Sequence, residues 1–220
     1  TVAVVGATGA IGRVCADLLA GEAARVLLVA RDEKKLEDLR ERLKTRAEPS
    51  RSGHARAELV ISTRMDVLAK AQMILTVTSA IHDVISPEYL QPGSVVCDVA
   101  RPRDVSAMVA KARDDILVID GGMVDVPGNV NFHFNFGFPE GKAYACMAET
   151  IALALEGRFE DYTVGKDITI ERVQEITVIA ERHGFKMSGF RSFEREVTEK
   201  QIEAGLQNAR NGTKRARGGS

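Results

Sequence analysis

Several features are scarce in this 220-residue chain, and each absence excludes a class of protein. Tryptophan is absent and aromatic residues make up 5% of the chain, so the core must be mainly aliphatic. The three cysteines, Cys15, Cys97 and Cys146, are widely spaced and form no C-x-x-C pair, which argues against a disulfide framework or zinc site and favours a reducing cytoplasm. No apolar run approaches the roughly 18 residues of a membrane span.

Charge and length narrow the range of partners further. Thirty basic and thirty-one acidic side chains give a formal net charge of −1, which argues against a nucleic-acid-binding surface. The length predicts one domain with an appendage, and we expect no metal site and leave a homo-oligomer open. The first residue is not methionine and falls inside an apolar run, so we expect that an N-terminal substrate region is missing.

Strand-like and helical segments alternate over the first 120 residues. Short apolar runs predict strands at 1–5, 25–30, 58–62, 73–78, 94–99 and 116–119. Helical spacing predicts a first helix with the apolar stripe Ile11, Val14, Cys15, Leu18 and Leu19, and a second with Leu36, Leu39 and Leu43. Residues 45–57 are predicted to be a polar connection. This alternation indicates an α/β fold with a Rossmann-type, doubly wound parallel sheet.

A glycine-rich turn, Gly6-Ala7-Thr8-Gly9-Ala10-Ile11-Gly12, joins the first strand to the first helix. Glycines at this spacing permit a sharp turn, close approach of a pyrophosphate to the backbone, and tight packing of helix on strand. The helix N-terminus then offers free N–H groups to the phosphates. We therefore expect a dinucleotide cofactor to contact Gly6, Thr8, Gly9, Ala10 and Ile11. The alternative is a glycine-rich turn without a ligand.

The residues after the second strand indicate which dinucleotide binds. An acidic residue there binds the 2′-hydroxyl of NAD, whereas an arginine accommodates the 2′-phosphate of NADP. Arg31 comes first here and Asp32 follows, which favours NADP(H). Alternatively, Arg31 only flanks a helix start and Asp32 is an ordinary N-cap. Thr78, Ser79 and Ala100 follow later strands, where we expect further cofactor contacts.

The pattern changes after Asp120. Residues 121–141 form a loop rich in glycine, asparagine and phenylalanine, and a helix is predicted at 139–156 with the apolar stripe Tyr144, Met147, Ile151 and Leu155. Another helix is predicted from about 170 to 183, ending at Gly184, with His183 in a structural role. We expect an NADP-binding domain at 1–138, a helical portion packing on it at 139–207, and a disordered basic tail at 208–220.

Cys146 is the candidate nucleophile, although a helical cysteine is by itself more often a small buried residue. Cys15 and Cys97 are interpreted as core residues. From Thr1 to about Lys186 the sequence resembles the long-chain acyl-[acyl-carrier-protein] reductases of cyanobacteria. The shared stretches are TVAVVGATGAIG at 1–12; Ala30, Arg31 and Leu36; Asp120-Gly121-Gly122 with Val124; Ala145-Cys146-x-Ala148-Glu149; and GKDITI at 165–170 with Arg182-His183-Gly184-Phe185.

This resemblance implies an activity. In that family the cysteine of the A-C-x-A-E helix is acylated by substrate, and Cys146 occupies this position. The resemblance therefore implies that NADPH reduces a fatty acyl thioester, carried on acyl carrier protein or CoA, to an aldehyde through a Cys146 acyl-enzyme. No His or Lys lies one helical turn from Cys146, so the group that activates the thiol is not identified.

Residues 79–85 and 97–105 depart from the acyl reductase pattern, and residues 120–123 have a second resemblance, so other functions are open. Residues 97–105 are more similar to the cofactor domain of glutamyl-tRNA reductase. Residues 120–123 resemble the shikimate dehydrogenase turn near the nicotinamide, which places Gly122 among the expected cofactor contacts. One alternative is therefore a shikimate- or quinate-type NADP-dependent dehydrogenase with an inert Cys146. Another is a non-catalytic NADP(H)-binding regulatory module.

Overall fold

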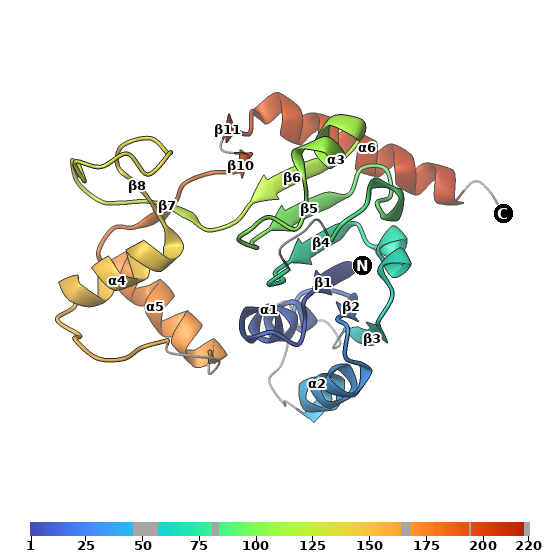
Figure 1. Ribbon diagram of the computed structural model, residues 1–220, viewed down its shortest axis with the longest axis horizontal. Helices are drawn as coiled ribbons and strands as arrows, with labels where there is room; N and C mark the ends of the chain where they lie inside the picture. The colour runs from blue at the N-terminus through green and yellow to red at the C-terminus, as the bar shows by residue number, and fades with distance from the viewer. Residues whose placement is uncertain (46–56, 81–83, 164–167, 194, 218–220) are drawn as a thin grey trace. The chain divides into compact units, whose positions relative to one another are not determined.

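The computed structural model describes residues 1–45, 57–80, 84–163, 168–193 and 195–217, which are the coloured segments in Figure 1. The chain forms two compact units. The first comprises Thr1–Ile119 and Thr198–Ser220, and the second comprises Asp120–Val197. The division thus falls at residue 120 rather than at the expected 138, because the strand that follows Asp120 pairs with later strands of the second unit.

A sheet flanked by helices forms the first unit. Its strands follow the order β6-β5-β4-β1-β2-β3, and the pairs β1–β2, β2–β3, β1–β4 and β4–β5 are parallel. The strand bounds are β1 (Val2–Val5), β2 (Arg25–Val29), β3 (Glu58–Ser62), β4 (Met73–Thr76), β5 (Val95–Asp98) and β6 (Leu117–Asp120). The helices are α1 (Ala10–Ala20), α2 (Glu33–Thr45), η1 (Met65–Lys70), η2 (Pro87–Tyr89), α3 (Ala107–Ala112) and α6 (Glu199–Arg217). This order confirms the predicted Rossmann-type α/β fold.

The faces that α1 and α2 bury differ in how well the sequence predicted them. The stripe of α2 is confirmed, since Leu36, Leu39 and Leu43 are all buried. The predicted stripe of α1 is right in part, since Val14 is buried and Cys15, Leu18 and Leu19 are partly buried, whereas Ile11 is 46% exposed. The helix also buries Gly12, Ala16 and Ala20, small residues that let it approach the sheet closely. Most of the predicted polar connection at 45–57 lies outside the described residues.

The C-terminal helix α6 was not expected. Residues 208–217, predicted as part of a disordered tail, continue this helix, which packs within the first unit. The Asn208 side-chain amide donates to the carbonyl oxygen of Asp115 over 3.4 Å, and a Cβ at Gly205 would lie 3.7 Å from Leu117 Cβ. These contacts join segments far apart in sequence, so local composition gave no sign of them. Among the described residues, no helix is long and apolar enough to cross a membrane.

The second unit combines a small antiparallel sheet with two helices. Its sheet has the order β8-β7-β9. Both helices contribute one side to the core of the unit. The elements are β7 (Met123–Asp125), β8 (Lys142–Tyr144), α4 (Ala145–Leu155), α5 (Ile170–Arg182), β9 (Lys186–Met187), and the short pair β10 (Arg191–Ser192) and β11 (Arg195–Glu196). The predicted stripe of α4 is right in part, because Met147 and Ile151 pack against the core, whereas Leu155 is 55% exposed and the buried residues of the helix are Ala148, Ala152 and Leu153. Gly184 has φ +86°, as predicted for the residue after α5.

Candidate functional site

The three glycines between β1 and α1 meet different physical constraints. Gly6 has φ +80°, and a Cβ there would lie 2.8 Å from the Val77 carbonyl oxygen. A Cβ at Gly12 would lie only 2.2 Å from the carbonyl oxygen of Gly6. A Cβ at Gly9 would approach Gly6 O at 3.3 Å, a much milder contact. Gly6 and Gly12 are therefore required by the packing of the turn, whereas Gly9 leaves room where a phosphate would approach the backbone.

The N-terminus of α1 is free to receive an anion. Gly9 is its N-cap and supplies no side-chain hydrogen bond, and the first turn contains no acidic residue. The first N–H groups of a helix have no partner within the helix and carry a partial positive charge. The N–H groups of Gly6 and Ala7 donate to the Val29 carbonyl oxygen at 2.9 and 3.2 Å, which fixes the turn beside the end of β2. This arrangement fits the pyrophosphate of a dinucleotide.

Asp32, three residues after the end of β2, is engaged by its own helix. Its carboxylate accepts from the Lys35 backbone N–H at 3.1 Å and lies 3.1 Å from Lys35 Nζ. The backbone hydrogen bond from Lys35, followed by the bond from its side chain, lowers the pKa of Asp32. Arg31 is exposed beside it. The N-cap interpretation therefore holds for Asp32, and Arg31 is the side chain at this strand end that is suited to a 2′-phosphate.

A fully buried carboxylate holds the segment after β4. Asp104 accepts hydrogen bonds from the Thr76 hydroxyl, from the Thr78 hydroxyl and, at 2.9 Å, from the Thr78 backbone N–H. Ser79 follows and is exposed. The sequence reasoning chose Thr78 and Ser79 but missed Asp104. In the sequence, Asp104 is recognisable only as an acidic residue shortly after an apolar strand. That pattern does not reveal that its partner, Thr78, lies 26 residues earlier.

A second buried carboxylate, Asp98 at the end of β5, shapes the next segment. It accepts from the backbone N–H groups of Ala100 and Val105 at 3.0 and 2.9 Å. Burial raises the pKa of Asp98, and the charge of nearby Asp104 adds to that increase, while the two backbone hydrogen bonds oppose it. Ala100 is 3% exposed and its N–H is taken by Asp98, so it offers a ligand no free backbone donor.

The strand register brings most of the predicted cofactor residues to one edge of the sheet. Val5 pairs with Val29 and with Thr76, and Thr76 pairs with Asp98. Four parallel strands therefore end side by side, and the segments after them carry the predicted contacts, which are Gly6, Thr8, Gly9, Ala10, Ile11, Arg31, Thr78, Ser79 and Ala100. Ligands bind at this carboxyl edge in open α/β sheets. Gly122 and Cys146 belong to the second unit.

Cys146 lies in the first turn of α4 and is exposed, whereas Cys15 and Cys97 are partly buried. Burial raises the pKa of Cys15. The N-cap of α4 is Tyr144, which makes no capping side-chain bond, and the first turn has no acidic residue. Gly122, with φ +87°, accepts from the Ala145 N–H through its carbonyl oxygen at 2.6 Å. Gly122 thus holds the start of the helix that presents the Cys146 thiol.

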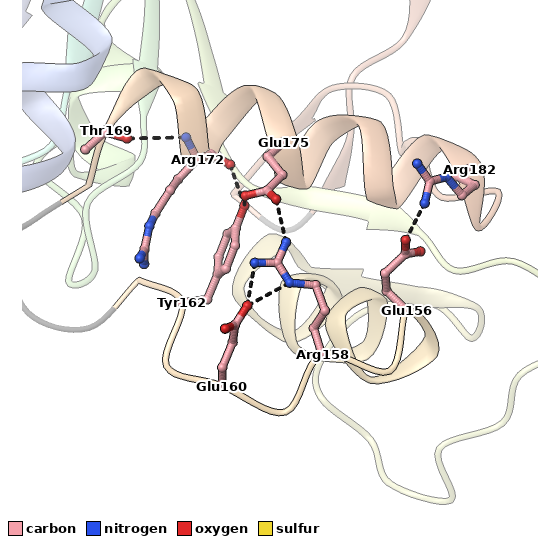
Figure 2. A network of polar contacts seen from close by, with 8 residues as sticks. All are labelled: Glu156, Arg158, Glu160, Tyr162, Thr169, Arg172, Glu175 and Arg182. Atoms are coloured by element: carbon pink, nitrogen blue, oxygen red, sulfur yellow. Dashed lines mark hydrogen bonds and ion pairs between the residues drawn. The ribbon is translucent and has the colours of Figure 1, made fainter.

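A polar cluster ties α4 to α5, and Figure 2 shows its parts. Tyr162 is 4% exposed, and its hydroxyl donates to Glu175 Oε2 at 2.8 Å. Burial, together with this hydrogen bond, raises the pKa of Tyr162 to about 12. The guanidinium groups of Arg158 and Arg172 lie 5.1 and 5.2 Å from the centre of its ring. The cluster fixes the helix that carries Cys146 against its neighbour.

His183, at the end of α5, has the structural role that the sequence predicted, and its partner is Glu156. Its Nε2 lies 2.7 Å from Glu156 Oε2, and Arg182 also pairs with Glu156, as Figure 2 shows for the arginine. The hydrogen bond with His183 is the main cause of the lowered pKa of Glu156. His82 and His54 lie outside the described residues, as do Gly165, Lys166 and Asp167.

Comparison with known proteins shows the family to which the first unit belongs. Residues 1–120, more than half of the chain, match the family model of shikimate / quinate 5-dehydrogenase. The chain belongs to this family. The match ends at residue 120, where the second unit begins. The matched region therefore contains the glycine turn, Arg31 and the buried carboxylates Asp98 and Asp104.

Curated relatives extend the similarity beyond residue 120. The aminotransferase PigE of a Serratia species is 36% identical over 204 residues, covering 91% of this chain and 23% of PigE. The long-chain acyl-[acyl-carrier-protein] reductase of Synechococcus elongatus is 32% identical over 195 residues, covering 84% of this chain and 52% of that protein. The chain thus spans about half of one relative and about a quarter of the other.

Solved structures with a similar arrangement include nucleotide-dependent enzymes. The nucleotide-binding domain of glutamyl-tRNA reductase from Thermoplasma volcanium is 18% identical with a TM-score of 0.38, over 53% of this chain and 72% of that chain. Lactate dehydrogenase from Eimeria maxima is 14% identical with a TM-score of 0.40, over 94% and 72% of the two chains. From the family match and its own sheet, the first unit is an NAD(P)-binding domain of the dehydrogenase and reductase type.

Proposed function

We propose that this chain is the reductase part of an enzyme that uses NADPH to convert a fatty acyl thioester into an aldehyde. One observation carries the proposal. Cys146 is exposed in the first turn of a helix, and it lies within the region of similarity to the acyl-[acyl-carrier-protein] reductase. A thiol is chemically suited to this task, because it exchanges with a thioester and leaves again after reduction.

The first unit holds the cofactor in this proposal. Its glycine turn and the N–H groups of α1 bind the pyrophosphate, while Arg31 pairs with the 2′-phosphate. Thr78, fixed by Asp104, and exposed Ser79 line the same edge of the sheet. A bound reduced nicotinamide supplies two electrons as a hydride.

The thiol of Cys146 forms and breaks the covalent bonds. In its thiolate form it attacks the carbonyl carbon of the substrate, the carbon–sulfur bond to the carrier breaks, and the carrier takes a proton and leaves as a thiol. Addition of hydride and a proton to the Cys146 thioester gives a hemithioacetal. Its carbon–sulfur bond then breaks, which releases the aldehyde and restores the cysteine. Overall, acyl thioester, NADPH and one proton become aldehyde, carrier thiol and NADP⁺.

Mass spectrometry of the intact protein tests the proposal. Incubation with palmitoyl-CoA without cofactor should add one palmitoyl group, which Cys146→Ser abolishes and Cys97→Ser does not. Addition of NADPH should discharge the adduct as hexadecanal. An adduct that survives in Cys146→Ser, or one that NADPH leaves in place, contradicts the proposal.

The family match favours a second candidate. Because residues 1–120 match shikimate / quinate 5-dehydrogenase, hydride transfer to a cyclic ketone is the alternative, with no covalent role for Cys146. NADPH oxidation by 3-dehydroshikimate, unaffected by Cys146→Ser and without any acyl adduct, would establish it. Tight NADPH binding with neither reaction would instead indicate a regulatory nucleotide-binding module.

A further inference from the structure

We propose that an aromatic hollow in the second unit binds the alkyl chain of the thioester. The proposal rests on the function above, because it assigns the part of the substrate that extends away from Cys146. The aromatic hollow is an open depression of about 470 Å³ lined by residues between Asn131 and Lys142. A volume of this size lies in the range of sites for small ligands.

A continuous series of rings lines this hollow and leads to the start of α4. Phe134 and Phe136 have ring centres 4.7 Å apart, Phe136 and Phe138 are stacked at 5.5 Å, and Phe138 meets Tyr144 edge-on at 5.0 Å. Phe132 joins Phe136 at 5.9 Å. Half of the eight phenylalanines of the chain thus lie in this one segment, and Phe134 is 70% exposed. Aromatic side chains gathered in one partly exposed segment can form a binding surface.

The polar residues between the rings stabilise the segment itself. Asn131 Oδ1 accepts from the His133 N–H at 2.7 Å, and Asn135 Oδ1 accepts from the Gly137 N–H at 2.8 Å. At the base, Lys142 Nζ pairs with Asp125 Oδ1 at 2.7 Å. Asn131, Asn135 and Lys142 are thus engaged within the second unit, and the rings supply the apolar part of a lining that also includes His133 and Glu140. In this proposal the rings bind the hydrocarbon chain of the ligand.

The position of Cys146 identifies the occupant. Tyr144, the last ring of the series, is the N-cap of α4, and Cys146 follows two residues later. In this proposal an acyl group bonded to the Cys146 sulfur starts at the Tyr144 end of the rings, which is the end nearest to Cys146 along the chain. A short acyl group ends near Tyr144, whereas a long one extends over Phe138 and Phe136 toward Phe134. The geometry therefore predicts that the rings contribute to binding only for long chains.

Acylation by two thioesters of the same carrier tests this prediction. The rate of acylation of Cys146 is measured by intact mass with palmitoyl-CoA and with butyryl-CoA. Phe134→Ser should lower the palmitoyl rate about tenfold and change the butyryl rate less than about twofold, because only the long chain loses apolar contact. Phe159→Ser is the matched control, since Phe159 is also an exposed phenylalanine of the second unit, at 86%, and lies outside the hollow. It should leave both rates unchanged.

A binding measurement separates the hollow from the chemistry. A fluorescent polyene fatty acid is titrated into the Cys146→Ala variant, with and without Phe134→Ser, and its affinity is measured from the change in fluorescence. Weaker binding with Phe134→Ser but not with Phe159→Ser supports the hollow even if no thioester acylates the protein, in which case only the proposed function fails. Acylation with an unchanged ratio of palmitoyl to butyryl rates in Phe134→Ser overturns the hollow and leaves the proposed function intact.

Discussion

Single residues at the carboxyl edge of the sheet divide into those that shape the backbone and those that face a ligand. Gly6 and Gly12 belong to the first kind, because a Cβ at either would overlap backbone atoms. Asp32 belongs there too, since its carboxylate caps α2. Arg31 is exposed and comes directly after β2, so its charge is available to a ligand. Arg31 is therefore the residue that should distinguish the two dinucleotides.

Arg31→Asp should weaken NADPH binding by about 10- to 100-fold and NADH binding by less than about threefold, because a charge-assisted contact to the 2′-phosphate becomes a repulsion. Isothermal titration with both nucleotides measures the difference. Arg42→Asp, a matched charge reversal in the last turn of α2, should leave both affinities unchanged. Equal losses for NADPH and NADH in Arg31→Asp would remove this side chain from the phosphate site.

At the scale of elements, one buried phenol adds a polar contact to the apolar packing of α4 and α5. Tyr162 packs between two guanidinium groups and donates to Glu175 on α5, while the loop that carries it follows α4 directly. Its folded pKa of about 12 exceeds the ordinary value of 10.0, so the neutral phenol stabilises the folded state. This stability is present below pH 10 and is lost as the pH rises toward 12.

Tyr162→Phe should lower the free energy of unfolding by about 1 kcal/mol at pH 8, since the hydrogen bond to Glu175 is lost. The wild type should then lose about 2 kcal/mol more than the variant as the pH rises from about 10 to 12. Urea unfolding across this range measures both effects. Tyr89→Phe, in η2 of the first unit, is the control. Parallel pH profiles for Tyr162→Phe and wild type would show that the phenol does not stabilise the folded state in this way.

At the scale of the whole molecule, the chain leaves the first unit after Ile119 and returns to it at Thr198. The returning segment is α6, and its backbone at Ala209 lies very close to Gly93. A Cβ added at Gly93 would be only 2.1 Å from the backbone nitrogen of Ala209. Gly93 also has φ +77°, which a side chain rarely adopts. A glycine before β5 thus permits the C-terminal helix to dock on the first unit.

Gly93→Ala should lower the free energy of unfolding by about 3 kcal/mol or more, because backbone strain and the displacement of α6 add together. Thermal unfolding followed by circular dichroism measures the loss. Gly21→Ala is the control in the same unit, since Gly21 has φ −84° and its Cβ would lie 3.4 Å from the nearest atom. Equal melting temperatures for the two variants would show that α6 does not dock at Gly93.

Local sequence was enough for the features that depend on neighbours along the chain. The strand at 58–62, the α2 stripe, the glycine turn and the end of α5 at Gly184 follow from residue type and spacing, which act over a few residues. The candidate positions at the strand ends follow from the same alternation. The roles of Cys146, Arg31 and the other candidate residues remain predictions, which the experiments above test.

Tertiary packing alone decided the rest. It decided which residues of α1 are buried, made a helix of residues 208–217, divided the chain at residue 120, and fixed the segment after β4 on Asp104. Several of these features depend on partners tens of residues away, such as Asp104 with Thr78 or Gly93 with Ala209. A contact of this kind leaves no periodic trace in the sequence, because its free energy comes from burial and hydrogen bonding between segments that only the folded chain brings together.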